Sequence, residues 1–154
     1  MKFVTKQDLE CPIAHVFAQS ADFAGFERQA LRRGANVRRV DQSQHYGLGS
    51  GWDVIFKFRG KERQMKAVVT AWDPPNGYAV QSTSSGIEGT VLVELVPLSR
   101  GRTRLSLSIE LVPKTIAARI MVQSLRLARG TLQRRLDLRM SDYASDIVER
   151  YRPV

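Results

Sequence analysis

The sequence predicts an α+β fold in which a curved antiparallel sheet of about seven strands is covered by one long C-terminal helix. Residues 52–112 alternate apolar and polar side chains between short turns, which is typical of antiparallel strands with one covered face. Residues 115–150 instead carry apolar side chains at helical spacing. The chain has 154 residues, about the length of one domain, so we expect a single domain over residues 1–154.

The first part of the chain predicts a strand at 2–10, helices at 11–18 and 23–33, and a strand at 35–43. Pro12 suits the first turn of the first helix, where its missing N–H is not needed. Gly34 ends the second helix. The predicted order is therefore one strand, two short helices, six further strands and the long helix.

Four turns predict how the later strands pair: Gly60-Lys61, 74–77, Ser85-Gly86 and 99–101. They set the following pairs: Phe56 with Met65, Asp73 with Tyr78, Val80 with Val91, and Leu95 with Leu105. All four registers place apolar side chains on one face of the sheet. A slip of one residue in the pairing would move the apolar side chains to the other face, so the apolar face strongly constrains the strand register.

The apolar face of the sheet is the feature that bears most on function. It consists of Trp52, Phe56, Phe58, Met65, Tyr78, Val80, Val91, Val93, Leu105, Leu107 and Ile109. These side chains form either an ordinary core or, in part, the lining of a ligand cavity, because one helix cannot fill the concave side of a strongly curved sheet. The few polar groups on this face, Tyr78, Ser82 and Thr103, would orient a ligand carbonyl or hydroxyl.

The predicted C-terminal helix contains a glycine and an arginine that interrupt its pattern. About 36 helical residues would span roughly 54 Å, so we expect a bend near Gly130 or an overhang. Arg129 breaks the apolar stripe to which Leu125 belongs. It either passes the edge of the core to meet solvent or an acid, or reaches into the cavity and binds an anionic ligand head. Arg139 is a second candidate for that role.

Several stretches resemble one known family: Cys11-Pro12-Ile13-Ala14-His15-Val16-Phe17, Ala21-Asp22-Phe23, Gly49-Ser50-Gly51-Trp52, Asp73-Pro74-Pro75-Asn76-Gly77 and Gly101-Arg102-Thr103-Arg104-Leu105. With the element order, they make the chain similar to the helix-grip fold of the START/Bet v 1-like (SRPBCC) superfamily, in particular its polyketide cyclase/dehydrase-like family. The resemblance covers nearly the whole chain. It implies a cavity for a hydrophobic ligand and no particular reaction. Phe26-Glu27-Arg28-Gln29 stands where the family often has a Trp, so the cavity mouth is expected to differ.

Cysteine and histidine usage excludes several kinds of site. The single cysteine, Cys11, excludes a disulfide framework and a Cys-rich metal site, and two histidines, His15 and His45, leave little for a His-based metal centre. We therefore expect no metal and no cofactor. Residues 47–51 are glycine-rich but precede a strand and lack a following Lys, so they do not predict a nucleotide-binding loop. His15 is interpreted as an edge histidine, with a pocket acid–base role as the alternative.

The formal net charge of +9 is concentrated in one region. Residues 114–139 contain seven basic residues and one acid, which gives a net charge of +6. The outer face of the predicted helix combines Arg119, Arg126 and Arg134 with Ile116, Ile120, Leu127 and Leu138. This pattern indicates either a solvated basic face or contact with an anionic membrane surface or a protein partner. The aromatic side chains point into the fold, which argues against nucleic acid.

The leading functional hypothesis is binding or transport of a hydrophobic or amphipathic small molecule, lipid-, quinone- or polyketide-like, between the sheet and the C-terminal helix. The predicted ligand-binding residues are Trp52, Phe56, Phe58, Met65, Tyr78, Val80, Ser82, Val91, Val93, Leu107, Leu125 and Arg129. No catalytic residue is assigned.

Two alternatives remain at this point. One is a cyclase/aromatase-type enzyme acting on a polyketide-like substrate in the same cavity, with Tyr78, Ser82, His15 and Arg129 as candidate groups. The other is a membrane- or protein-interaction module that uses the basic outer helix face. No apolar run approaches ~18 residues and the first residues lack the apolar stretch of a signal peptide, so we expect a cytoplasmic protein.

Overall fold

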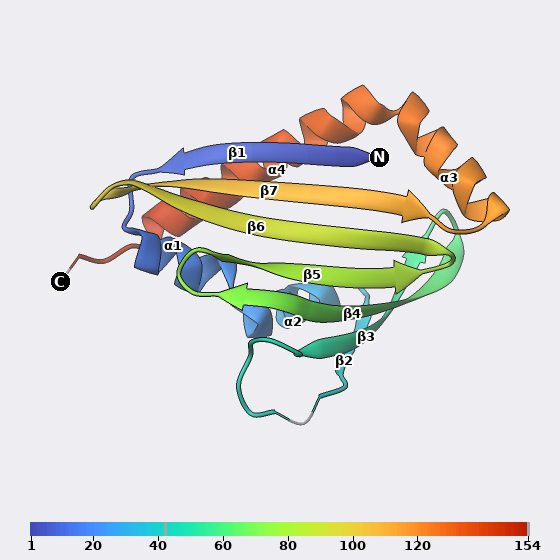
Figure 1. Cartoon of the computed structure of the whole chain (residues 1–154), viewed down its shortest axis with the longest axis horizontal. Helices are drawn as coiled ribbons and strands as arrows, with labels where there is room; N and C mark the ends of the chain where they lie inside the picture. Colours follow the sequence, from blue (N-terminus) through green and yellow to red (C-terminus); the bar gives the residue numbers. More distant parts are fainter. Residues whose placement is uncertain (42, 154) are drawn as a thin grey trace.

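The computed structural model describes residues 1–41 and 43–153. Its elements, labelled in Figure 1, are β1 (Lys2–Leu9), α1 (Ile13–Ser20), α2 (Phe23–Arg32), β2 (Asn36–Arg39), β3 (Gly51–Phe58), β4 (Lys61–Asp73), β5 (Gly77–Ser84), β6 (Ile87–Ser99), β7 (Arg102–Pro113), α3 (Ile116–Leu127) and α4 (Arg129–Glu149). The seven strands form one antiparallel sheet in the order β1-β7-β6-β5-β4-β3-β2. The predicted α+β architecture is confirmed. The strand expected at 35–43 ends at Arg39, and residue 42 lies outside the described residues.

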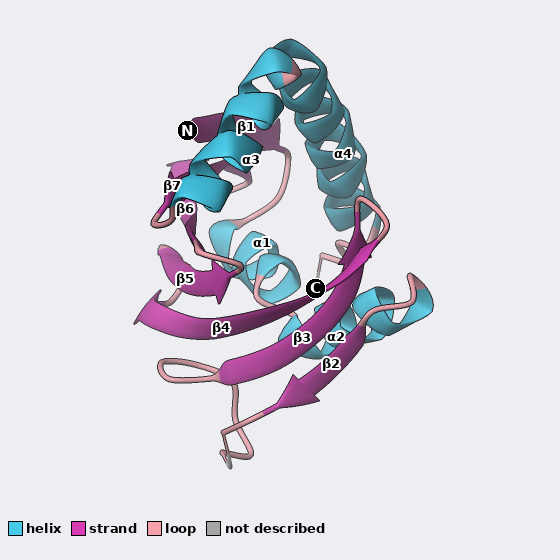
Figure 2. Ribbon diagram, turned by 90° about the vertical axis from the view of Figure 1, so that its right-hand side faces the viewer, coloured by secondary structure: helices cyan, strands magenta, loops and turns pink. Residues whose placement is uncertain are grey.

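The sheet is strongly curved, and the helices lie on its concave side (Figure 2). α4 packs along β1 and α3 along β7, so both lie near one edge of the sheet. α2 packs against β2 at the opposite edge, and α1 packs on β6 and β7. The inner faces of the middle strands are therefore only partly covered by helices, which leaves room for pockets on the concave face.

The pairing of the last three strands agrees with the prediction, since Val80 lies opposite Val91 and Leu95 lies opposite Leu105. The loop predicted at 99–101 is shorter, because Ser99 pairs with Arg102 and the ladder shifts between Pro97 and Ser99. The extra residue is absorbed by this irregularity within β6 instead of by the turn.

The register predicted between β3 and β4 is wrong by two residues. Phe56 pairs with Arg63 instead of Met65, because the turn is Arg59-Gly60. Both turn residues have positive φ, 53° and 73°, as a two-residue hairpin turn of this hand requires. A shift of two residues leaves every side chain on its predicted face, so the apolar face survives. It also sets Arg63 opposite Phe56 on that face.

A bulge in β4 overturns the predicted pair of Asp73 with Tyr78. The ladder shifts between Val69 and Ala71, and Trp72 pairs with Tyr78. The bulge turns Trp72 toward the core, where its ring lies 5.9 Å from that of Phe23. Strict alternation would have left Trp72 on the outer face.

The long C-terminal helix is divided into α3 and α4 at Ala128, whose backbone angles are φ −102° and ψ 14°. The bend expected near Gly130 therefore occurs two residues earlier. The Thr115 hydroxyl caps the start of α3 by accepting a hydrogen bond from the Ala118 amide at 3.1 Å. Arg59 Nη1 donates to Ser124 Oγ at 2.8 Å and ties the β3–β4 turn to α3.

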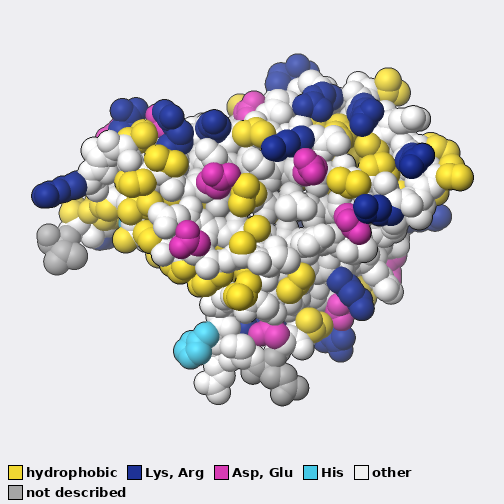
Figure 3. Space-filling model, in the orientation of Figure 1, with side chains coloured by type: hydrophobic (Ala, Val, Ile, Leu, Met, Phe, Trp, Pro, Cys, Tyr) yellow, Lys and Arg dark blue, Asp and Glu magenta, His cyan; other side chains and the backbone are white. Residues whose placement is uncertain are grey.

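The tightest part of the core lies where α1 and the second half of α4 meet β6 and β7. Val16, Leu105 and Ile147 are almost completely buried there. On the surface, Lys and Arg side chains gather along the rim formed by α3 and α4 (Figure 3). None of the helices in the described part of the chain is long and apolar enough to cross a membrane.

Candidate functional site

Three adjoining pockets hollow the concave face of the sheet. The central pocket, of about 260 Å³, lies between β5–β7 and α4. The α2 pocket, of about 390 Å³, lies between α2 and the strands β2–β6. The α3 pocket, of about 240 Å³, lies under α3. Phe26, Tyr78 and Val91 line both of the first two, and Met65 lines both of the last two, so we treat the three as one cleft.

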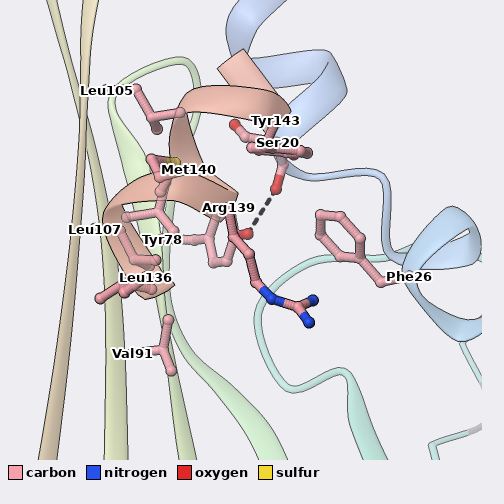
Figure 4. A pocket seen from close by; sticks show the side chains of 11 residues that line it. Ser20, Phe26, Tyr78, Val91, Leu105, Leu107, Leu136, Arg139, Met140 and Tyr143 are labelled. Carbon is pink, nitrogen blue, oxygen red and sulfur yellow. Dashed lines mark hydrogen bonds between the residues drawn. The ribbon is translucent and has the colours of Figure 1, made fainter. Parts of the chain in front are cut away.

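The central pocket is shown in Figure 4. Its lining is apolar except at a few points and consists of Ser20, Phe26, Tyr78, Val91, Val93, Leu105, Leu107, Leu136, Arg139, Met140 and Tyr143. The Arg139 side chain extends from α4 into the space between Val91 and Phe26. Among the described residues it has no hydrogen-bonding or ion-pair partner, and it is exposed. The pocket is therefore an apolar hollow with one solvated cation at its open side.

The α2 pocket is built around an aromatic cluster. The Phe23 ring meets the rings of Trp52 and Tyr78 edge-on, at centroid distances of 5.3 and 5.1 Å. Glu27 lies on the wall, where its Oε1 accepts hydrogen bonds from Trp52 Nε1 at 2.7 Å and from the Tyr46 hydroxyl at 3.1 Å. Burial and the bond to Glu27 raise the pKa of Tyr46. The carboxylate thus orients two aromatic rings at the mouth of this pocket.

The α3 pocket lies beneath the inner side of α3. It is lined mainly by Phe56, Phe58, Arg63, Met65, Ser82, Ile87, Leu111, Met121 and Leu125. Phe58 is 38% exposed, which leaves this end of the cleft open to solvent. Arg63 is half-buried, and its Nε atom is buried without a hydrogen-bond partner among the described residues. Arg63 is the one charged residue among those described around this pocket, whose wall is otherwise formed by apolar side chains, Gly89 and the serines Ser82, Ser84 and Ser85.

Two tyrosine hydroxyls in the cleft are already engaged with the backbone. Tyr78 donates to the Ser20 carbonyl at 2.6 Å, and Tyr143 donates to the Gln19 carbonyl at 3.1 Å. Burial raises the pKa of Tyr78 well above its usual range and, with the nearby charge of Asp22, raises the pKa of Tyr143 to about 12. Both phenols are therefore neutral hydrogen-bond donors that fix α1 to the rest of the core.

Eleven of the twelve predicted ligand-binding residues line the cleft. They are Trp52, Phe56, Phe58, Met65, Tyr78, Val80, Ser82, Val91, Val93, Leu107 and Leu125. Their grouping follows from the strand alternation, which the registers preserve. Whether they bind a ligand stays a prediction.

Arg129 was included among the predicted ligand-binding residues but lies outside the cleft, as in the alternative in which it passes the edge of the core. Its Nη2 donates to the Lys2 carbonyl at 2.8 Å, and its guanidinium carbon lies 5.4 Å from the centre of the Phe3 ring. The helix restarts at Arg129 after the break at Ala128, so its position on a continuous helical wheel does not apply. Arg139 is the arginine of α4 that lines the cleft.

The four groups considered for a cyclase-type reaction do not meet at one place. Tyr78 lines the central and α2 pockets, and Ser82 lines the α3 pocket. His15 Nε2 lies 2.8 Å from the Ile147 carbonyl oxygen, away from all three pockets, and Arg129 lies outside. Among the described residues, no three His, Cys, Asp or Glu side chains are grouped as metal ligands would be.

Sequence reasoning missed Arg63 as part of the cleft, and it placed Glu27 at the cavity mouth without finding its role there. Arg63 could have been found, because it has the same parity along its strand as Met65 and therefore points to the apolar face. The role of Glu27 could not, because it depends on the docking of α2 against Trp52 and Tyr46, which are distant in sequence.

Comparisons with known proteins bear on the fold. No protein-family model matches the chain, and no curated protein is significantly similar to it. The crystal structure of the Zhui aromatase/cyclase from Streptomyces sp. R1128 is similar, with a TM-score of 0.68 at 15% identity over 99% of this chain and 96% of that chain. Norcoclaurine synthase from Thalictrum flavum, in complex with dopamine and hydroxybenzaldehyde, gives a TM-score of 0.67 at 14% identity over 100% and 89%.

A third structure shares less of the architecture. An HSP90 activator from Plasmodium falciparum gives a TM-score of 0.51 at 20% identity over 75% of this chain and 76% of that chain. Proteins of similar fold therefore include enzymes, one of them crystallised with small aromatic molecules, and a protein that acts on another protein. Likeness at these identities establishes architecture and not activity. The chain therefore has a helix-grip fold, the architecture that its resemblance to START/Bet v 1-like (SRPBCC) proteins predicted.

Proposed function

We propose that the protein binds an elongated, mainly apolar small molecule in the cleft. The observation that carries this proposal is the continuity of the three pockets along the concave face. Val80 and Val91 in the middle of the sheet are only half-buried, and both line the hollow. A ligand that covers them removes apolar surface from water, which contributes roughly 25 cal/mol per Å².

Most polar groups of the cleft are already hydrogen-bonded within the protein, which favours a ligand that is mainly apolar. The Tyr78 and Tyr143 hydroxyls are satisfied by backbone carbonyls, and Glu27 is held by two donors. A ligand therefore needs few matching polar groups along most of its length. Proteins of similar fold include one crystallised with dopamine and hydroxybenzaldehyde, which supports the use of this face for small molecules.

Filling the cleft with a larger side chain tests the proposal. Val91 lines two of the pockets, so Val91→Trp is expected to weaken binding of dodecanoate by tenfold or more, measured by calorimetry. Leu92→Trp is the matched control, because Leu92 lies on the opposite face of the same strand and is 36% exposed. It is expected to bind like the wild type. Circular dichroism checks that both variants fold.

Chain length provides an independent measure. Each methylene moved from water into the cleft is expected to raise affinity about fourfold, until the cleft is full. A series of saturated fatty acids from eight to sixteen carbons should therefore show a rise followed by a plateau. Equal weak binding across the series, with wild-type affinity in Val91→Trp, would overturn the proposal.

A second candidate function is contact with an anionic membrane surface through α3 and the start of α4. The observation that favours it is exposure: Leu127 is 92% exposed, Ile116 79% and Ile120 64%. Arg119 and Arg126 lie on the same helix, and Figure 3 shows basic side chains along this rim. Apolar side chains flanked by arginine suit the interface of an anionic bilayer.

Vesicle sedimentation tests this candidate. Binding is expected with vesicles containing 30% phosphatidylglycerol, and it should fall with added salt and with pure phosphatidylcholine. Arg119→Gln with Arg126→Gln should weaken it, since each cationic group near the surface contributes about 1 kcal/mol. Arg28→Gln with Arg32→Gln, on α2, removes the same charge elsewhere and should have no effect. Equal loss from both pairs would exclude a specific role for α3.

A further inference from the structure

We infer that Arg63 binds the anionic head group of the ligand, so that the ligand is an amphipathic acid whose head lies at the α3 end of the cleft. This inference rests on the proposed function and adds the chemical class and the direction of the ligand. It is drawn from the position of Arg63, from its unpaired Nε and from the character of the walls around it.

Arg63 lies on the inner face of β4. It pairs with Phe56 and shares its face with Met65, and all three line the α3 pocket. The side chain therefore leaves the sheet on the side of α3, where Met121 and Leu125 form the opposite wall. On the α3 side the Arg63 side chain is thus surrounded mainly by apolar groups. The residue also borders a neighbouring polar pocket lined by Asp53, Glu62 and Lys66, and its side chain forms an ion pair with neither of these carboxylates.

The Nε of Arg63 has no acceptor. The atom is buried, and no hydrogen bond or ion pair of this side chain is formed within residues 1–41 and 43–153. Three serines line the same pocket; Ser82 donates to the Gly89 carbonyl at 3.3 Å and Ser84 to the Gln64 carbonyl at 2.7 Å, and no hydroxyl of Ser82, Ser84 or Ser85 accepts a hydrogen bond from Arg63 Nε. A buried donor without a partner costs free energy that an acceptor from outside would recover.

A carboxylate supplies that acceptor with the correct charge. Guanidinium and carboxylate groups form charge-assisted hydrogen bonds that are strongest when water is partly excluded, as at this wall. The remainder of the cleft runs from Met65 to Val80 and Val91 and on into the central pocket. An acid with its head at Arg63 would therefore lay its apolar body along the continuous part of the cleft.

Arg139 also borders the cleft but is the poorer head-group site. It is an exposed residue, so water can satisfy its guanidinium without a ligand. An anion that binds there replaces water molecules that already satisfy the guanidinium, so the gain in free energy is small. At Arg63 the buried Nε has no such alternative.

The test compares an acid with its uncharged analogue. Wild-type protein is titrated with dodecanoate and with dodecanol, and the same is done for Arg63→Gln, Arg139→Gln and Lys66→Gln. Lys66 lies on the same strand with its exposed side chain on the opposite face, so its variant controls for net charge. We expect Arg63→Gln to weaken dodecanoate binding by about tenfold or more and to leave dodecanol binding unchanged.

Melting of the ligand-free variants is the second readout. Because Arg63→Gln removes an unsatisfied buried donor, its melting temperature should be equal to or above that of the wild type. A loss of dodecanoate binding in a variant that melts normally cannot then be ascribed to misfolding. Arg63→Met, which fills similar space without a donor, should behave in the same way.

Four results would overturn the inference, and they separate it from the proposed function. Equal weakening of both probes by Arg63→Gln would make Arg63 a packing residue. Selective loss in Arg139→Gln alone would place the head at the other end, and equal loss in Lys66→Gln would reduce the effect to net charge. In each of these cases cleft binding stands. Failure of the wild type to bind either probe would overturn both.

Discussion

The Tyr143 hydroxyl shows how single residues of the cleft combine fold and site. Its ring forms part of the central pocket, while its hydroxyl hydrogen-bonds the Gln19 carbonyl at the end of α1. The ring carbons of Tyr143 therefore line the cleft, while its hydroxyl oxygen links α4 to α1. Burial, with the charge of Asp22, keeps it neutral by raising its pKa to about 12.

A pH-dependence follows from this shift. Below about pH 10 the proton stays on Tyr143 in both the folded and the unfolded chain, so its contribution to stability is fully present. Between pH 10 and 12 the unfolded chain ionises first, and stability falls by about 2–3 kcal/mol. Tyr143→Phe should be slightly less stable at pH 7 and should lose stability less steeply in this range, measured by urea unfolding. The same steepness in both proteins would contradict the assignment.

Residue identity alone did not decide the roles of the arginines. The sequence pattern offered Arg129 and, as a second candidate, Arg139 as cations that could reach the cavity; Arg139 lines the cleft, Arg129 does not, and Arg63 was not foreseen. Parity along β4 was sufficient to find Arg63. No local signal could have excluded Arg129, because its direction depends on where the helix breaks.

At the scale of elements, turns and bulges account for what the sequence could and could not predict. The β5–β6 and β6–β7 registers followed from their turns and from the apolar alternation. The β3–β4 register could not be predicted from its turn, because Arg59 adopts a positive φ, which is uncommon for a residue other than glycine. Gly130 predicted the approximate place of the helix break, but the break falls at Ala128, where α3 packed on β7 meets α4 packed on β1.

The hairpin that begins β5 depends on one glycine. Gly77 has φ 150°, and an added Cβ would collide with the carbonyl oxygen of Val93 on the neighbouring strand. Gly77→Ala is therefore expected to destabilise the fold by about 2–3 kcal/mol, seen as a lower midpoint in urea unfolding.

Gly101 in the β6–β7 turn is the control for that change. Nothing lies within 4 Å of a Cβ built there, and Gly101→Ala should alter stability by less than about 0.5 kcal/mol or raise it slightly. Similar losses at the two glycines would indicate that backbone entropy, and not the collision at Gly77, sets the cost.

At the scale of the whole molecule, the cleft results from where the helices dock on the sheet. α3 and α4 follow β7 and β1, and α2 follows β2, so the inner face of the strands between them borders the hollow. The sequence was sufficient to predict the apolar face and the helix that covers it. It could not predict which strand each half of the helix packs against, because an apolar stripe shows which face of a helix is buried but not which strand covers it.

The contact made by Arg129 has a consequence for the whole protein in solution. β1 is an edge strand, and its outward carbonyls at Lys2 and Val4 accept hydrogen bonds from Arg129 at 2.8 Å and Gln133 at 3.0 Å. One helical turn of α4 thus occupies two acceptors that a strand of another molecule would need. The residue predicted to hold a ligand instead protects the sheet against edge-to-edge aggregation.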